Sequence, residues 1–143
     1  MAYELVIGER MYSSWSLRAW LIFEQFGLPV STKVAPMQTP EFHEILADFA
    51  PARLVPTMRS AGRVVWDTLA IAETLAEAHP GLWPEDAADR ALARSLVAEM
   101  HSGFPALRST CAMNLRTRFE TPPLSDAGEI ILHRIAERRC LEP

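Results

Sequence analysis

Short alternating apolar runs and amphipathic stretches follow one another through the first part of the chain. Alternation at Tyr3–Gly8 predicts a short strand, and Val30–Val34, where the chain restarts in extended form after Pro29, predicts a second. Between them, apolar residues recur at helical spacing and predict a helix that begins near Ser14 or Trp15 and ends at Gly27. A strand–helix–strand order of this kind is typical of a βαβ unit with two parallel strands.

The next segment carries the signals of a short helix and a hairpin. Thr39 is a good N-cap residue and proline follows it, which predicts a helix that ends before Pro51. Apolar residues at 54–58 and 64–66 predict two strands, and Gly62 lies in the tight turn between them. These strands are therefore expected to form a β-hairpin.

A Pro/Gly-rich segment separates two regions of different pattern. Before it, an amphipathic stretch predicts a helix whose N-terminus either Asp67 or Thr68 would cap, so the predicted order is β-α-β-α-β-β-α. Residues 80–84 then read as a linker. We therefore expect one domain over residues 1–79 and a helical one over residues 85–143.

The second region reads as entirely helical. Apolar residues form one stripe from residue 85 to about residue 118, which predicts a long helix kinked at Gly103 and Pro105. Ser125 would cap a last helix that runs to the end of the chain.

Composition narrows the possible partners. Of the 143 residues, 49% are hydrophobic and 22% are charged, and the formal charge of -4 comes without a basic stripe, which argues against a nucleic-acid partner. No apolar run is long enough to span a membrane and the N-terminus lacks a secretory pattern, so a cytoplasmic location is expected. Cys111 and Cys140 read as free thiols, and the four histidines show no metal-ligand spacing, so no metal is expected.

Three segments together resemble the cytosolic glutathione transferase family. They are Tyr12-Ser-Ser-Trp-Ser-Leu-Arg18, Leu54-Val-Pro-Thr57 and Trp66-Asp-Thr-Leu-Ala-Ile-Ala-Glu-Thr-Leu75. The Ser-Ser-x-Ser segment is similar to that of the zeta class and its bacterial relatives, and residues 99–108 resemble the fourth helix of bacterial members. The resemblance implies an α/β thioredoxin-like N-terminal domain followed by an all-α domain. Family members are longer, so we expect this all-α domain to be incomplete.

The resemblance implies that a serine activates the thiol of glutathione, the co-substrate. A free thiol with a pKa near 8.5 is mostly protonated at neutral pH, so a hydroxyl and a helix N-terminus that stabilise the thiolate would promote reaction. Ser13 is favoured as this thiol partner and Ser14 is the close alternative. Simple helix capping by either serine is the competing interpretation.

The other two segments would hold the rest of glutathione. A cis peptide at Val55-Pro56 would let the Val55 backbone pair with the cysteinyl unit, although a strand-entry proline without a ligand is the plainer interpretation. Thr68 and the helix N-terminus would bind the γ-glutamyl carboxylate, and Asp67 the γ-glutamyl amine, where a simple N-cap pair is the alternative. The further glutathione-binding candidates are Trp15, Gln38 and His43.

A further group of residues could line the pocket for the hydrophobic electrophile. These candidates are Met11, His101, Phe104 and Arg108. For Phe104 a place in the core fits equally well, and for Arg108 a salt bridge does. An exposed apolar helical face predicts a homodimer, to which Leu75, Leu92 and Leu96 would contribute.

The leading hypothesis is therefore a transferase that conjugates glutathione to small hydrophobic electrophiles. A non-catalytic glutathione-binding or scaffold module is the main alternative. A zeta-like isomerase is weakened because Trp15 stands where that class has cysteine. A thiol-disulfide oxidoreductase needs a low-pKa cysteine at the start of the first helix, where this chain has serines.

Overall fold

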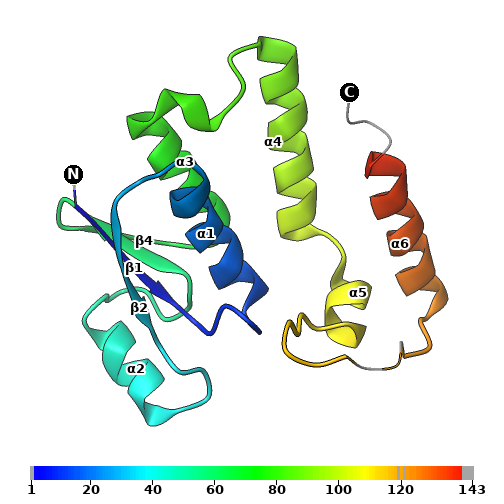
Figure 1. The fold of residues 1–143 in the computed structure, drawn as a ribbon, viewed down its shortest axis with the longest axis horizontal. Helices are drawn as coiled ribbons and strands as arrows, with labels where there is room; N and C mark the ends of the chain where they lie inside the picture. The colour runs from blue at the N-terminus through cyan, green and yellow to red at the C-terminus, as the bar shows by residue number, and fades with distance from the viewer. Residues whose placement is uncertain (1, 119, 121, 140–143) are drawn as a thin grey trace.

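A four-stranded mixed sheet occupies the N-terminal part of the chain, and helices make up the rest (Figure 1). This computed structural model describes residues 2–118, 120 and 122–139. The strands are β1 (Tyr3–Ile7), β2 (Val30–Val34), β3 (Thr57–Ser60) and β4 (Arg63–Trp66). Their order in the sheet is β2-β1-β3-β4; β1 and β2 are parallel, and the other neighbours are antiparallel. The predicted βαβ unit and hairpin are confirmed.

Alternation along β1 supplies both faces of the sheet with core residues. Tyr3, Leu5 and Ile7 pack beneath α1 (Ser14–Gln25) and α3 (Thr68–Ala78). Val6 points to the opposite face, where it packs with residues of α2. The α2 helix spans Pro40–Ala47. Because successive side chains of a strand point to opposite faces, one buried strand anchors both helical layers.

Local capping signals set the helix boundaries. Ser13 caps α1 and Thr39 caps α2, and in each case the side-chain oxygen accepts a hydrogen bond from a backbone N–H of the first turn. Pro40 follows at the first helical position of α2, as the sequence predicts. Gly27 has a φ of 60°, the left-handed conformation that glycine adopts readily after a helix.

The hairpin begins later than its apolar pattern suggests. Strand β3 starts at Thr57, whereas the pattern predicted strand from residue 54; Leu54 is 68% exposed. Pro56 has no N–H with which to join the ladder, so pairing begins after it. The predicted cis peptide at Val55-Pro56 is present. Ala61 and Gly62 have φ values of 48° and 75°, the conformation of a tight two-residue hairpin turn.

The helical part departs from the prediction of one long kinked helix. After the short 3-10 turn η1 (Pro80–Leu82), α4 (Ala87–Ser102) and α5 (Pro105–Thr110) are separate helices, and residues 111–118 are not helical. The helix ends because Phe104 adopts a φ of 66° and Pro105 lacks an N–H. At Gly103 a Cβ atom would stand 2.6 Å from the Glu99 carbonyl oxygen, so this tight exit requires glycine.

The last helix, α6, spans Asp126–Arg139 and lies beside α5 (Figure 1). Its start matches the predicted cap, since Ser125 accepts hydrogen bonds from the Gly128 N–H. The predicted continuation to the chain end and Cys140 lie outside the described residues. Cys111 is a free, exposed thiol.

Leu75 corrects the predicted association face. It is completely buried in the core beneath α3, so it offers no surface to a partner, whereas Leu92 on α4 is 46% exposed. The helical spacing that suggested an outward face at Leu75 is the spacing by which α3 packs on the sheet. No helix in the described ranges is long and apolar enough to cross a membrane.

Candidate functional site

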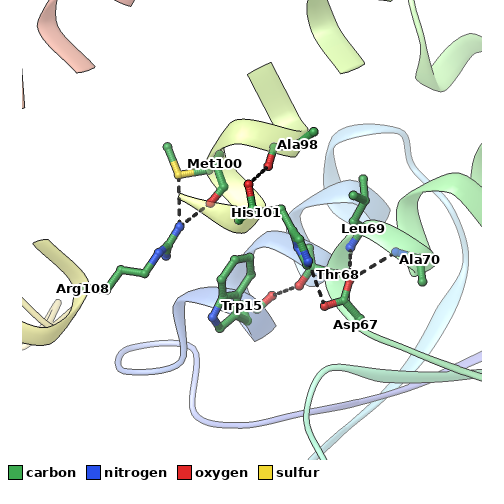
Figure 2. Close-up of polar contacts among 10 residues, drawn as sticks. Trp15, Asp67, Thr68, Leu69, Ala70, Ala98, Met100, His101 and Arg108 are labelled. Atoms are coloured by element: carbon green, nitrogen blue, oxygen red, sulfur yellow. Dashed lines mark hydrogen bonds and ion pairs between the residues drawn. The ribbon is translucent and has the colours of Figure 1, made fainter. Parts of the chain in front are cut away.

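The three motif segments meet at one corner of the sheet. The Thr68 hydroxyl donates a hydrogen bond to the Trp15 carbonyl oxygen at 3.0 Å, which joins the start of α3 to the start of α1 (Figure 2). The Asp67 N–H donates to the Pro56 carbonyl at 3.3 Å, which brings the loop before β3 to the same place. Segments far apart in the sequence therefore share one surface.

Serine hydroxyls at the start of α1 form a small buried network. The hydroxyl oxygens of Ser13 and Ser16 are 2.8 Å apart, and the Gly8 N–H donates to the Ser16 oxygen at 2.9 Å. Ser16 is completely buried. Its role was not predicted, although it lies on the same face of α1 as Ala19 and Phe23, a spacing that marks a serine turned toward the core.

Ser14 stands apart from this network. It is half-buried, and its hydroxyl makes no hydrogen bond with any described residue. It lines a cavity of about 440 Å³ between α1, α5 and α6. The two serines therefore differ: Ser13 is held by Ser16, and Ser14 faces open space.

Asp67 uses both carboxylate oxygens. Oδ1 accepts hydrogen bonds from the N–H groups of Leu69 at 2.8 Å and Ala70 at 3.4 Å, so Asp67 is the N-cap of α3. Oδ2 lies 3.7 Å from Nε2 of His101 on α4 (Figure 2). The predicted role of Asp67 as a helix cap is thus confirmed. Its carboxylate also faces His101, which was predicted to line the electrophile pocket.

Thr68 is placed as predicted but its hydroxyl proton is engaged. Because that proton goes to the Trp15 carbonyl, the hydroxyl has none to give to a ligand carboxylate. The Thr68 backbone N–H, the first of α3, remains a donor at the positive end of the helix.

Aromatic and cationic side chains converge on Trp15. The guanidinium carbons of Arg18 and Arg108 each lie 4.6 Å from the centre of its indole ring, and the His101 ring contacts it edge-on at 5.4 Å. Arg108 also donates hydrogen bonds to the Met100 carbonyl, as Figure 2 shows, and to the carbonyl of Gly103, the residue after α4. Trp15 therefore joins α1 to the helical part of the chain.

Arg18 was not predicted as a site residue. Its Nη1 is buried and has no acceptor among the described residues, and Nη2 contacts only the weak acceptor Sδ of Met100 at 3.6 Å. Burial, and then the nearby charge of Arg108, lower the pKa of Arg18 below its ordinary value. Its position three residues after Trp15 on a helix was the available signal.

Two cavities border Trp15 on different sides. The 440 Å³ cavity is lined by Ser14, Arg18, Phe104 and Arg108, among others. A second cavity of about 370 Å³ is mostly apolar and lies between α1, α3 and α4, where His101 and Thr68 form part of its wall. The predicted pocket residues His101, Phe104 and Arg108 thus do border hollows, although on two sides of the indole.

Three predicted residues lie elsewhere. His43 is exposed and lines a separate hollow near Pro51. Gln38 is exposed in the loop before α2, with a φ of 63°. Met11 is 38% exposed and lines neither cavity beside Trp15, while its carbonyl accepts a hydrogen bond from Leu115. Their roles toward a ligand stay predictions. Within the described ranges, no three His, Cys, Asp or Glu side chains group as metal ligands.

Comparison with known proteins shows which family the domain containing these three segments resembles. The family model of the glutathione S-transferase N-terminal domain matches residues 12–78, which contain all three motifs. Residues 12–78 therefore form a glutathione S-transferase N-terminal domain. The resemblance carried by the motifs is therefore confirmed.

Relatives of this glutathione transferase domain are longer. A probable maleylacetoacetate isomerase from Caenorhabditis elegans is 31% identical over 113 residues, covering 78% of this chain and 52% of the relative. The chain thus spans about half the length of the curated relative that it matches.

Solved glutathione transferases share the fold. A homologue from Burkholderia BGR1 with bound glutathione is 26% identical with a TM-score of 0.62, over 76% of this chain and 58% of that one. An unclassified glutathione S-transferase from Bombyx mori has a TM-score of 0.74 at 22% identity, over 96% and 66% of the two chains, and supports the fold alone. The predicted thioredoxin-like domain followed by a helical region is confirmed.

Proposed function

We propose that this chain binds glutathione across the starts of α1 and α3 and conjugates its thiolate to small hydrophobic electrophiles. The convergence of the serine, Val-Pro and Asp-Thr segments carries this proposal, because their meeting brings a hydroxyl, a free strand-like backbone and two helix N-termini to one corner. The homologue from Burkholderia whose structure contains glutathione supports the ligand.

Ser13 is our candidate for activating the thiol. Either hydroxyl of the Ser13–Ser16 pair can donate to the other. If Ser16, anchored by the Gly8 N–H, donates to Ser13, the Ser13 proton is free to point at the sulfur. Such a chain of hydrogen bonds polarises its members and favours the thiolate. Ser14 is the alternative, supported by its unengaged hydroxyl at the cavity wall.

The remaining groups would hold the cysteinyl and γ-glutamyl units of the tripeptide. Val55 lies two residues before Thr57, the first paired residue of β3, so its backbone groups can pair with the cysteinyl unit. The α3 N-terminus would take the γ-glutamyl carboxylate through the Thr68 N–H, and Asp67 would take the amine in place of its long contact to His101.

The electrophile would enter the cavity beside Ser14, where Phe104 supplies an apolar wall. Cytoplasmic location and a homodimer belong to the same proposal. A glutathione-binding module without turnover is the competing proposal, since the chain spans only part of its relatives.

Retention on immobilised glutathione, followed by conjugation of glutathione to chlorodinitrobenzene, tests the proposal. Ser13→Ala and Ser14→Ala are compared separately. We expect Ser13→Ala to remain bound to the resin and to lose about a hundredfold in kcat, the usual cost of removing a hydrogen bond made to a developing anion.

The outcomes separate the alternatives. If Ser14→Ala is the variant that loses turnover, Ser14 is the thiol partner. Retention of the wild-type chain without turnover supports the binding module. No retention and no turnover contradict the proposal.

A further inference from the structure

Two arginines border the electrophile cavity without a carboxylate to balance them. Arg18 from α1 and Arg108 from α5 flank the indole of Trp15, each at 4.6 Å. Among the described residues, no carboxylate lies within ion-pair distance of either guanidinium. Asp67, the acid that reaches this cluster, faces His101 and the α3 backbone instead.

The partners of these arginines are neutral. Arg108 uses Nε and Nη2 on carbonyl oxygens and the Met100 sulfur, which leaves Nη1 for another acceptor. Arg18 has the Met100 sulfur and a buried, unpartnered Nη1. Both arginines are half-buried. Indole contacts stabilise a guanidinium only modestly, whereas holding two like charges partly out of water without a counter-ion is unfavourable.

Burial beside a cavity distinguishes Arg18 and Arg108 from the other arginines that contact aromatic rings. Arg10 also lies over an indole, that of Trp20 at 4.4 Å, without an ion-paired carboxylate in the described part of the chain, but Arg10 is exposed to water. Arg59 stacks on Phe49 and pairs with Glu4. Arg94 stacks on Trp83 and lies 3.7 Å from Glu73. In both cases a carboxylate accompanies the aromatic contact. The Arg18–Arg108 pair lacks that carboxylate and opens on a cavity of about 440 Å³.

We propose that this cavity binds an electrophile that carries a carboxylate, held by Arg18 and Arg108 while its reactive carbon faces the start of α1. This inference rests on the proposed transferase function and names the substrate class of the same site. The carboxylate accepts hydrogen bonds from the guanidiniums and compensates their charge. Its apolar remainder packs against Phe104.

The test uses matched electrophiles. The acid is chlorodinitrobenzoate, with chlorine opposite the carboxylate and between the nitro groups, and the neutral control is its methyl ester. In both, the glutathione thiolate bonds to the ring carbon and chloride leaves with the bonding pair of electrons. We expect kcat/KM for the acid to exceed that for the ester by about tenfold or more, as hydrogen bonds to a charged group imply.

Arginine variants locate the effect. Arg18→Met and Arg108→Met should each reduce the ratio of kcat/KM for the acid to kcat/KM for the ester about tenfold. Arg94→Met is the matched control. Arg94 also stacks on a tryptophan, Trp83, but it does not line the 440 Å³ cavity beside Ser14. It should keep the wild-type ratio.

A binding experiment separates failure of this inference from failure of the transferase function. Calorimetric titration of wild-type chain with unreactive dinitrobenzoate and its methyl ester needs neither turnover nor a variant. Preferential binding of the acid, weakened by high salt, supports the anion site even if conjugation is absent. Equal binding of acid and ester, or an equal kcat/KM for both electrophiles, overturns it.

Discussion

The Thr68 hydroxyl donates a hydrogen bond to the Trp15 carbonyl at 3.0 Å, and so fixes the start of α3 against the start of α1. Both ends of the proposed glutathione site depend on this contact, because one helix carries the serines and the other carries Asp67. A side chain expected to touch the ligand instead holds the two ligand-binding helices together.

Thr68→Val removes this bond while keeping the shape of the side chain. We expect a loss of about 1 kcal/mol in the free energy of unfolding and weaker glutathione binding, since the Trp15 carbonyl loses its donor. Thr68→Ser retains the hydroxyl and should stay close to wild type. Urea unfolding and calorimetry measure both effects, and unchanged affinity in the valine variant contradicts the proposed coupling of the two helices.

Asp67→Asn separates the charge of this side chain from its capping role. Asparagine caps helices as well as aspartate does, so stability should change little, whereas the proposed contact with the γ-glutamyl amine loses its negative charge. We expect glutathione affinity to fall about tenfold, the effect of weakening a hydrogen bond to a charged group.

Asp86→Asn is the control for that experiment. Asp86 caps α4 in the same manner, accepting from the Ala88 N–H at 2.8 Å and the Asp89 N–H at 3.0 Å. It lies away from the three motif segments and should leave glutathione affinity unchanged. Equal effects of the two variants on affinity would mean that Asp67 does not bind the amine.

Ser16→Ala tests the buried hydroxyl network. Removal of this completely buried oxygen leaves the Gly8 N–H without its acceptor and should cost about 1–3 kcal/mol in the free energy of unfolding. Ser95, whose exposed hydroxyl donates to the Ala91 carbonyl at 2.9 Å, provides the control. Ser95→Ala should change stability by no more than about 0.5 kcal/mol. Equal, small effects in urea unfolding would refute a structural role for Ser16.

The ion pair between Glu4 and Arg59 should make a contribution to stability that is lost at low pH. They are directly opposite on β1 and β3, and Nη2 of Arg59 lies 2.5 Å from Oε2 of Glu4. The hydrogen bond from Arg59 lowers the pKa of Glu4 in the folded state below its ordinary value of 4.5. The pair therefore stabilises the folded state at pH values above the ordinary pKa of Glu4. This stabilisation is lost as the pH falls through the lower pKa that Glu4 has in the folded state.

Glu4→Gln measures this contribution. The difference in free energy of unfolding between wild type and variant should be constant near neutral pH and should shrink as pH drops below about 4.5. Because Glu4 is exposed and Arg59 is only partly buried, added salt should also reduce it. A difference that is independent of both pH and salt would show that the pair contributes nothing electrostatic.

Much of the fold was predictable because its signals are local. Ser13, Thr39 and Asp67 each cap the helix that follows, and a cap acts over only two or three residues. The long helix expected to reach about residue 118 was wrong for a different reason. Its apolar stripe continued past Gly103, but the left-handed turn at Phe104 ends α4 and redirects the chain.

The sequence by itself determined the order of strands and helices, their caps and the family motifs, since each depends on neighbouring residues. The tertiary structure alone decided which side chains meet. Leu75 is buried because α3 packs on the sheet, and the Thr68 hydroxyl is engaged because α1 lies beside it. Arg18 and Arg108 share one indole because α5 returns to α1 after the break at Phe104. No local pattern encodes that meeting, because it depends on where distant helices pack.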